Sequence, residues 1–168
     1  MNEFEKFRDI SVFKGLNEEQ VRSLFEICRR VIFQKNDVIM EEDEDRFSIY
    51  FFIDGEVLVT NVITMKMSNQ AGYSEVEKSL VRLSADQVGV LGEMSVFEEQ
   101  KRSATVKAYA PCILYEIDRK EFLQFLEDQP ETGVKILFNI ASILCARVRR
   151  GNTDILKLTT ALSIALSR

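Results

Sequence analysis

Residues 89–97 read GVLGEMSVF, and after four polar residues the chain continues with RSATV at 102–106. Gly92 allows a backbone to approach a ligand closely. A short helical turn that starts directly after Gly92 would direct the N–H groups of Met94 and Ser95 at an anion. These two segments therefore predict a binding place for a negatively charged group.

Two charged side chains complete the predicted site. Arg102 carries a rigid fork of donors that suits phosphate oxygens, and it returns on the next strand to close the site. Glu93 accepts hydrogen bonds from a sugar hydroxyl, and its charge balances that of Arg102 when no ligand is bound. Ala104 is small where a larger side chain would crowd a phosphate. The pattern predicts a cradle for the ribose and phosphate of a small nucleotide, built from Gly92, Glu93, Met94, Ser95, Arg102, Ser103 and Ala104.

Outward from this stretch, residues 31–117 form short runs rich in Val, Ile, Phe and Tyr, separated by polar or acidic turns. Such runs are typical of the strands of a sandwich or barrel. Asp54 and Gly55 between two runs indicate a hairpin, because Gly accepts the positive φ of a tight turn. Met65–Glu77 is polar with little periodicity, so we expect a long, mobile hairpin loop there. The predicted strands are Val31–Phe33, Val38–Met40, Ser48–Ile53, Glu56–Thr64, Ser79–Leu83, Ser103–Ala108 and Ile113–Ile117.

Three predicted helix starts share a capping box, in which a side chain at the cap and a Glu or Gln three residues later satisfy free backbone N–H groups. The first helix is expected near Glu18–Arg29, with an apolar face at helical spacing. The three boxes pair Asn17 with Gln20, Asp118 with Glu121, and Asp128 with Glu131.

After Pro130 the pattern becomes helical and stays so. A helix over Glu131–Leu166 would be roughly 50 Å long at ~1.5 Å per residue, more than one small barrel covers. Either the helix folds back on its own domain with a break at Gly151, or its distal half meets a partner. We expect a homodimer, because an apolar stripe left in water is a liability. The seam has heptad spacing and comprises Val134, Leu137, Ala141, Leu144, Val148, Gly151, Ile155, Leu158, Leu162 and Ala165.

Composition excludes several classes of function. The chain has 168 residues, a net charge of −5 and no His. Negative charge argues against a general attraction to nucleic-acid phosphates, and the missing His removes the commonest zinc ligand and the usual general base. No stretch reaches the ~20 apolar residues of a membrane span or resembles a signal peptide, so we expect a cytoplasmic protein. Three cysteines without CxxC spacing suit reduced, buried thiols: Cys28, Cys112 and Cys145.

The ordered motifs resemble the cyclic-nucleotide-binding domains of catabolite-activator-type bacterial regulators and of protein kinase A regulatory subunits. GEMS at 92–95 followed by RSATV at 102–106 is similar to that family's phosphate-binding cassette. FQKNDVI at 33–39, EED at 41–43 and IYFFIDGEV at 49–57 repeat its early strands and turns in order. The resemblance covers about Phe13 to Asn152.

This resemblance implies a mainly β fold, a double-stranded, jelly-roll-like β-roll with flanking helices and a long C-terminal helix. We expect a single domain over 1–168, with N-terminal helices in 1–30, the roll in 31–117 and C-terminal helices in 118–168. Asn36 and Glu42 stand where the family usually has Gly, and of the two only Asn tolerates a left-handed conformation well. Residues 84–88 replace a shorter family turn, which leaves the strand register before Gly92 open.

The resemblance also implies where a base would bind. The strands would supply apolar walls at Val59, Leu80 and Leu91, and the long helix, often a neighbouring subunit's, would cap the base near Arg149 and Asn152. An amide suits adenine and guanine equally. For Arg147, Arg149 and Arg150 the alternative is an ordinary solvated helix face.

The implied function is the binding of cyclic AMP, ahead of cyclic GMP, as a regulatory ligand by a non-catalytic cytoplasmic sensor with an unidentified effector protein. One alternative is a ligand-free scaffold in which Glu93 and Arg102 form a buried ion pair. Another is a fragment of a catabolite-activator-like transcription regulator, whose DNA-binding helices would follow Leu166. A sugar-phosphate isomerase on a cupin-like roll would need metal-binding His residues, which the sequence lacks.

Overall fold

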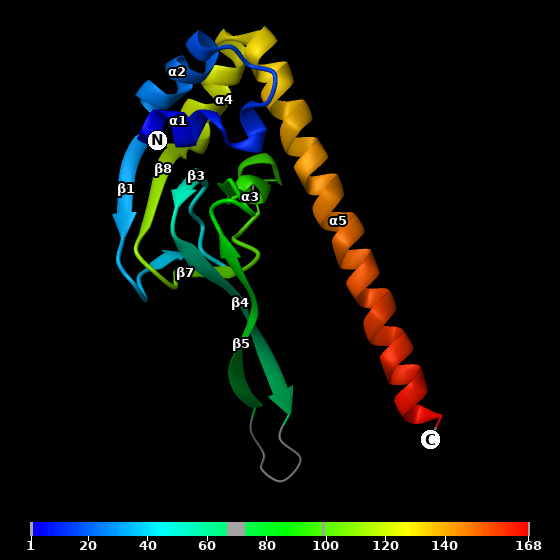
Figure 1. Ribbon diagram of the computed structural model, residues 1–168. Helices are drawn as coiled ribbons and strands as arrows, with labels where there is room; N and C mark the ends of the chain where they lie inside the picture. The colour runs from blue at the N-terminus through cyan, green and yellow to red at the C-terminus, as the bar shows by residue number, and fades with distance from the viewer. Residues whose placement is uncertain (1, 67–72, 99, 168) are drawn as a thin grey trace.

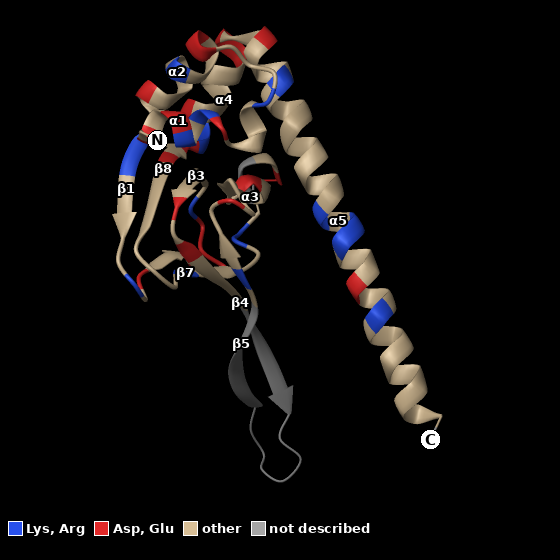
Figure 2. Cartoon of the chain, viewed as in Figure 1, with Lys and Arg blue, Asp and Glu red and all other residues tan. Residues whose placement is uncertain are grey.

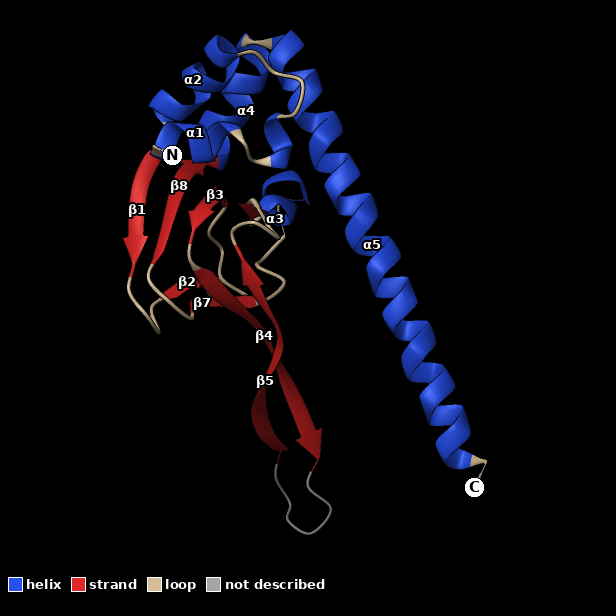
Figure 3. Ribbon diagram, viewed as in Figure 1, coloured by secondary structure: helices blue, strands red, loops and turns tan. Residues whose placement is uncertain are grey.

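The computed structural model describes residues 2–66, 73–98 and 100–167; within these, the side chains of 61–80, Ser95 and Val96 are not described. In this part of the chain, two four-stranded antiparallel sheets face each other, with helices gathered at one end and one long helix running past the roll (Figures 1 and 3). The predicted β-roll with flanking helices is confirmed. One sheet has the order β1 (Arg29–Phe33), β8 (Cys112–Asp118), β3 (Ser48–Asp54) and β6 (Val90–Leu91). The other has the order β2 (Val38–Met40), β7 (Thr105–Ala108), β4 (Glu56–Lys66) and β5 (Tyr73–Ser84).

One prediction about the strands is wrong, and one strand was not predicted. The segment Met65–Glu77 is not one long loop, because β4 and β5 continue as a ladder to the pair Lys66 and Tyr73. Strand ladders form through the backbone, so polar strands of low hydrophobic periodicity pair as well as apolar ones. The short strand β6, directly before Gly92, was not predicted, since two residues give no measurable periodicity.

Strand β3 divides the core in two because its side chains alternate between the faces of the sheet. Ile49, Phe51 and Ile53 belong to a cluster under the helices, whereas Tyr50 and Phe52 point into the roll. The helical side is rich in aromatic contacts, among them Phe7 to Phe51 at 5.1 Å between ring centroids. Each fully buried side chain of this size contributes about 1.5–3 kcal/mol, which anchors the helices to the sheet.

The helices are α1 (Glu3–Arg8), the 3-10 turn η1 (Ser11–Phe13), α2 (Glu18–Ile27), α3 (Glu93–Glu98), α4 (Arg119–Asp128) and α5 (Pro130–Leu166). The capping box of Asn17 is present in full, and the Asp118 carboxylate accepts two N–H groups of α4. The box expected at Asp128 is wrong, because Asp128 ends α4 and α5 begins at Pro130. Proline excludes its predecessor from the helical conformation and is pre-set for the first position of a helix.

Helix α5 runs unbroken through Gly151, at which an added Cβ would meet nothing within 4 Å. The predicted helix is confirmed, and the alternative with a break at Gly151 is wrong. The seam needs a correction in its first half, since Leu144 packs against the core of the roll together with Ile136, Ile140 and Ile143. The apolar stripe that the roll leaves exposed is Val134, Leu137, Phe138, Ala141, Cys145 and Val148.

Two smaller expectations also change. Cys145 is exposed rather than buried, whereas burial raises the pKa of the Cys28 and Cys112 thiols, as expected for inert structural cysteines. At the family's two glycine positions, Asn36 does adopt a positive φ of 74°, but the second left-handed residue is Asp43 at 66°, not Glu42. Asp reaches this conformation more easily than Glu, so the turn carries less strain than expected.

Candidate functional site

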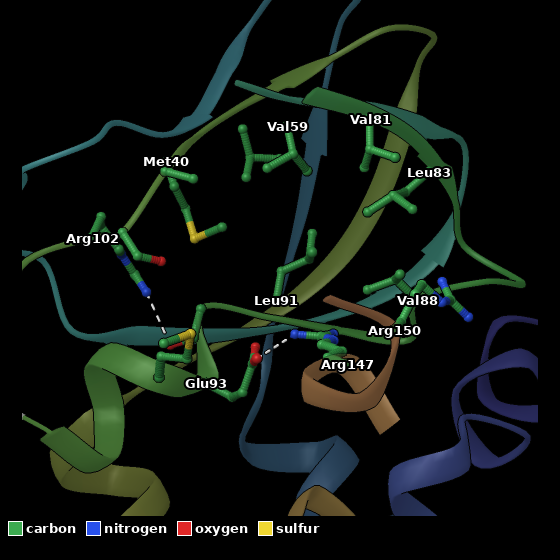
Figure 4. Close-up of a pocket in the computed structure, with 15 residues that line it drawn as sticks. Met40, Val59, Val81, Leu83, Val88, Leu91, Glu93, Arg102, Arg147 and Arg150 are labelled. Atoms are coloured by element: carbon green, nitrogen blue, oxygen red, sulfur yellow. Dashed lines mark hydrogen bonds and ion pairs between the residues drawn. The ribbon is translucent and has the colours of Figure 1, made fainter. Parts of the chain in front are cut away.

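A cavity of about 290 Å³ lies between the second sheet, the start of α3 and the middle of α5 (Figure 4). One wall is apolar and comes from the strands, and the other carries charged side chains from the α3 region and the helix. This mixture suits a ligand with an apolar ring and an anionic group. The lining residues are Met40, Val59, Val81, Leu83, Val88, Leu91, Gly92, Glu93, Met94, Arg102, Ser103, Ala104, Val106, Arg147 and Arg150.

Gly92 is fixed by two independent requirements. Its φ of 77° is a left-handed value that side chains disfavour. A Cβ at this position would also lie 2.4 Å from Nη1 of Arg102 and 2.8 Å from the carbonyl oxygen of Ser48. The glycine therefore makes room for the arginine.

Arg102 is almost fully buried, with 4% of its surface exposed. Its Nη1 donates to the carbonyl oxygen of Gly92 at 3.0 Å, and its Nη2 donates to that of Ser48 at 2.8 Å. Burial lowers the pKa of the guanidinium, but an arginine stays charged at any physiological pH. The result is a desolvated cation held by two carbonyl dipoles, which an anion can approach from the cavity.

Glu93 is 2% exposed and forms its ion pair with Arg147 of α5. Arg147 also donates from Nη2 to the carbonyl oxygen of Val90 at 3.0 Å. The sequence predicted that Glu93 would balance the charge of Arg102. The charge of Glu93 does act favourably on Arg102, but the direct ion pair of its carboxylate is with Arg147. The middle of α5 is thereby tied to the first residue of α3 and to β6 (Figure 4).

The family model described as "Cyclic nucleotide-binding domain" matches residues 30–129, more than half of the chain. The chain belongs to this family. The cAMP-activated global transcriptional regulator CRP of Pasteurella multocida is 26% identical over 129 residues, which make up 76% of this chain and 54% of the regulator. Glutaminase 1 of Bradyrhizobium diazoefficiens is 27% identical over 150 residues, covering 89% of this chain and 22% of that protein.

A solved cyclic nucleotide-binding domain from Methylobacillus flagellatus shares the fold with a TM-score of 0.73, at 24% identity, over 92% of this chain and 80% of that one. Compared with its sequence relatives, this cyclic nucleotide-binding domain spans about half the length of the regulator and about a fifth of the glutaminase. The family is a ligand-binding, regulatory one.

The structure brings most of the predicted cradle of this cyclic nucleotide-binding domain to one cavity. Of the seven cradle residues, Ser95 is the exception, because its side chain lies outside the described part; Gly92, Glu93, Met94, Arg102, Ser103 and Ala104 line the cavity. Two of the predicted apolar walls, Val59 and Leu91, line it as well. Leu80 belongs to β5, but its side chain is not described.

The predicted base contacts on α5 do not belong to the cavity of the same chain. Arg149 and Asn152 are exposed and do not line the cavity, whereas Arg147 and Arg150 do. The helix turns 100° per residue, so Arg147 continues the roll-facing series 136, 140 and 143 at helical spacing. That periodicity would have identified Arg147 from the sequence, and it excludes Arg149 and Asn152 from the same chain's pocket.

A buried polar cluster that no sequence pattern predicted lies behind Arg102. The Tyr50 hydroxyl donates to Oε1 of Glu116 at 3.0 Å, and Arg46 lies 3.3 Å from the same oxygen. Burial alone would raise the pKa of Glu116, but hydrogen bonds from Arg29, Tyr50 and Ser48 hold it below its usual range. Ser48 thus connects the two groups: its side chain bonds to Glu116 in this cluster, and its carbonyl oxygen accepts a hydrogen bond from Arg102.

Among the residues that the structure describes, no cluster of three or more Cys, Asp or Glu side chains is placed to hold a metal ion. No helix among them is long and apolar enough to cross a membrane.

Proposed function

We propose that this cyclic nucleotide-binding domain is a non-catalytic, cytoplasmic sensor whose regulatory ligand is cyclic AMP, ahead of cyclic GMP. The observation that carries the proposal is the cavity in which Glu93 and the buried Arg102 meet an apolar wall of strand residues. The preference for cyclic AMP is supported by the curated relative, which is a cAMP-activated regulator.

In the proposed complex, the phosphate lies against Arg102, Ser103 and Ala104, and a ribose hydroxyl donates to Glu93. The purine packs on the apolar wall that includes Val59 and Leu91. Charge-assisted hydrogen bonds from a desolvated arginine are worth roughly 1.5–3 kcal/mol each. Arg102 therefore supplies a large share of the affinity for the phosphate.

Signal transfer is proposed to start at the ion pair of Glu93 and Arg147. A ribose hydroxyl on Glu93 changes the environment of this pair, and Arg147 belongs to α5. A ligand shifts such an equilibrium only through different affinities for the two positions of the helix. Ligand binding thus biases the docking of α5 against the roll.

The exposed face of α5 is proposed to form a parallel homodimer. Its apolar side chains beyond the roll are largely solvent-exposed in a single chain, for example Ile155 at 60% and Leu162 at 59%. Two copies packed around a two-fold axis would bury this stripe. In the proposed dimer, Arg149 and Asn152 lie on a helix that reaches the second copy, so they can contact only the base of a nucleotide bound there.

Calorimetric titration with cyclic AMP and cyclic GMP tests the binding proposal. Micromolar binding of cyclic AMP that weakens roughly 100-fold in Arg102→Ala would support it, in line with the loss of about two charge-assisted hydrogen bonds. Arg8→Ala is the matched control, since this exposed arginine lies on α1, outside the cavity and away from α5. If neither nucleotide binds at millimolar concentration, the proposal is wrong.

The scaffold alternative has one observation in its favour. Arg102 and Glu93 both have partners within the protein, namely two carbonyl groups and Arg147. A scaffold of this kind would show the same thermal stability with and without cyclic nucleotide. A ligand that binds the folded state alone would raise the stability by about 2.7 kcal/mol at 100 times its Kd.

A further inference from the structure

A second concave surface lies at the opposite end of α5 from its free tip, between α2 and α4. One hollow of about 760 Å³ is bounded by the last turns of α2 and the outer face of α4. A second hollow of about 430 Å³ continues from it toward the start of α2 and the first turn of α5. Ser23 and Gln129 border both hollows, so the two form one groove. We call it the α2–α4 groove.

The floor of the α2–α4 groove is apolar at its wider end. Val21 and Leu24 of α2 are fully buried, but Ile27, one turn further along, is 47% exposed and borders the hollow. Phe125 of α4 lies beside it and is nearly buried. An exposed large aliphatic side chain in a concavity gains free energy when a partner's apolar side chain covers it.

The rim of the groove is strongly acidic, and Figure 2 shows acidic residues in the helices gathered at this end of the molecule. Its described lining contains Glu19, Asp118, Glu121, Asp128 and Glu131 against one cation, Lys120. Three of these carboxylates also have local partners, because Asp118 caps α4, Asp128 accepts a hydrogen bond from Nε2 of Gln124 at 2.9 Å, and Glu131 lies 3.4 Å from Lys135. The rim keeps a net negative charge in either case, and such a surface steers and orients a cationic partner.

The length of the groove fits a short helix. Along α2 it extends from Glu19 to Ile27, which corresponds to about 12 Å or two helical turns at ~1.5 Å per residue. An amphipathic helix places apolar side chains on one face at spacings of three and four, with charged side chains on its flanks. If leucine-like side chains of such a helix pack on Ile27 and Phe125, the lysines and arginines on its flanks lie beside the acidic rim.

We propose that the α2–α4 groove docks a cationic amphipathic helix of a partner protein. The groove is well placed to respond to α5. Gln129 is the N-cap residue of α5, and its Nε2 donates to the hydroxyl of Ser23 on α2 at 3.3 Å. A change in the direction of α5 would alter this contact inside the groove. Docking itself needs no nucleotide, so this inference and the proposed function fail independently.

The probe is a fluorescent synthetic peptide of about 14 residues, with leucines at helical spacing on one face and lysines elsewhere, long enough to exceed the groove. Fluorescence anisotropy with the full chain should show micromolar binding that weakens at high salt. A scrambled peptide of the same composition and a version with glutamates in place of lysines serve as controls. Both should bind at least 10-fold more weakly.

Variants of the protein place the binding in the groove. The double variant Glu121→Lys, Asp128→Lys should weaken binding of the peptide at least 10-fold, because it reverses two charges of the rim. Ile27→Asp should also weaken binding at least 10-fold, because it removes the apolar contact while the rim stays negatively charged. Glu127→Lys, on the same helix but outside the groove, should leave binding unchanged. All four positions are exposed, so circular dichroism melting curves should match those of the parent protein.

Three results would overturn the inference. These are no binding of the leucine-lysine peptide, equal binding of its scrambled form, and equal binding to the Glu121→Lys, Asp128→Lys variant. A peptide of residues 143–157 of this chain, which carries three arginines of α5, tests a different occupant. If that peptide binds more tightly than the designed one, the groove docks a second copy of this chain and the proposed partner is wrong.

Discussion

The two halves of α5 have the same kind of sequence but different surroundings. Residues 130–147 pack on the roll through Ile136 and Ile140 and end at the ion pair between Arg147 and Glu93. Residues 148–166 are exposed throughout, although they contain as regular an apolar pattern (Figure 1). Apolar periodicity thus tells which faces of a helix will be covered, but not what covers them. In the first half the roll covers Leu144, so the exposed stripe contains Cys145 in its place.

The largest effect is expected in the distal half. Ile155→Lys with Leu162→Lys places four charges in a symmetric interface, where each lost apolar contact is worth about 1.5–3 kcal/mol. The dimer should weaken by roughly 1000-fold or more and run as a monomer in light scattering. Leu156→Lys lies off the stripe and should leave the mass unchanged. A parent protein that is already a monomer at micromolar concentration would contradict the dimer proposal.

Oxidative cross-linking tests where the two halves meet. Cys145 is the exposed cysteine of the free stripe. At the axis of a parallel pair its Cα would lie about 6 Å from that of its counterpart, within the range of a disulfide. Mild oxidation should turn most of the protein into a covalent dimer, and Cys145→Ser should abolish this band on a non-reducing gel. Absence of a dimer band would contradict a parallel interface with Cys145 at its axis.

A smaller effect is expected in the proximal half. Arg147→Ala leaves the buried carboxylate of Glu93 without its partner, while Arg149→Ala two residues later removes an exposed cation. Because Arg147 is itself 39% exposed, water compensates part of the loss, and we expect a destabilisation of about 1–2 kcal/mol. This corresponds to a Tm lower by roughly 2–8 °C in a domain of this size. Arg149→Ala should change the Tm by less than about 1 °C; equal effects of both would contradict the division of α5 into two halves.

The smallest effect is expected at a contact between α1 and the roll, which does not involve α5. Glu3 of α1 accepts hydrogen bonds from Arg30 and Tyr115, and the bond from Arg30 is the main cause that lowers its pKa from 4.5 to about 2. A carboxyl with a lowered pKa in the folded state stabilises the fold above its unfolded pKa, and this contribution is lost as pH falls through the folded value. Glu3→Gln should therefore flatten the decline of the Tm between pH 4.5 and 2. An unchanged slope would show that this contact is unimportant in solution.

The sequence predicted those features that short-range patterns encode. Alternation located β3, the capping box located Asn17 at the start of α2, and the motif around Gly92 located most of the cavity. Features that depend on the relative placement of distant elements were not predictable in this way. The pairing of Glu93 with Arg147 depends on the path of α5, and the Tyr50–Glu116 cluster joins strands 66 residues apart.

Errors in the prediction share one cause. The loop at Met65–Glu77 and the cap at Asp128 were each predicted from residue type, which carries no information on the direction of the neighbouring elements. The pairing of β4 with β5 and the fixed backbone of Pro130 decide these positions. The resemblance to the family predicted site residues correctly where its motifs are contiguous, as around Gly92, but it did not predict which residues of α5 line the cavity.

Because α5 is continuous through Gly151, its two halves move together as one rigid rod. From Arg147 at the pocket to Leu166 at the tip the helix measures about 29 Å at ~1.5 Å per residue. If Arg147 acts as the pivot, a tilt of about 10° would displace the tip by about 5 Å, close to the pitch of one helical turn. A rearrangement of a single ion pair at the pocket could in this way move the far end of the molecule by the spacing at which packed helices change partners.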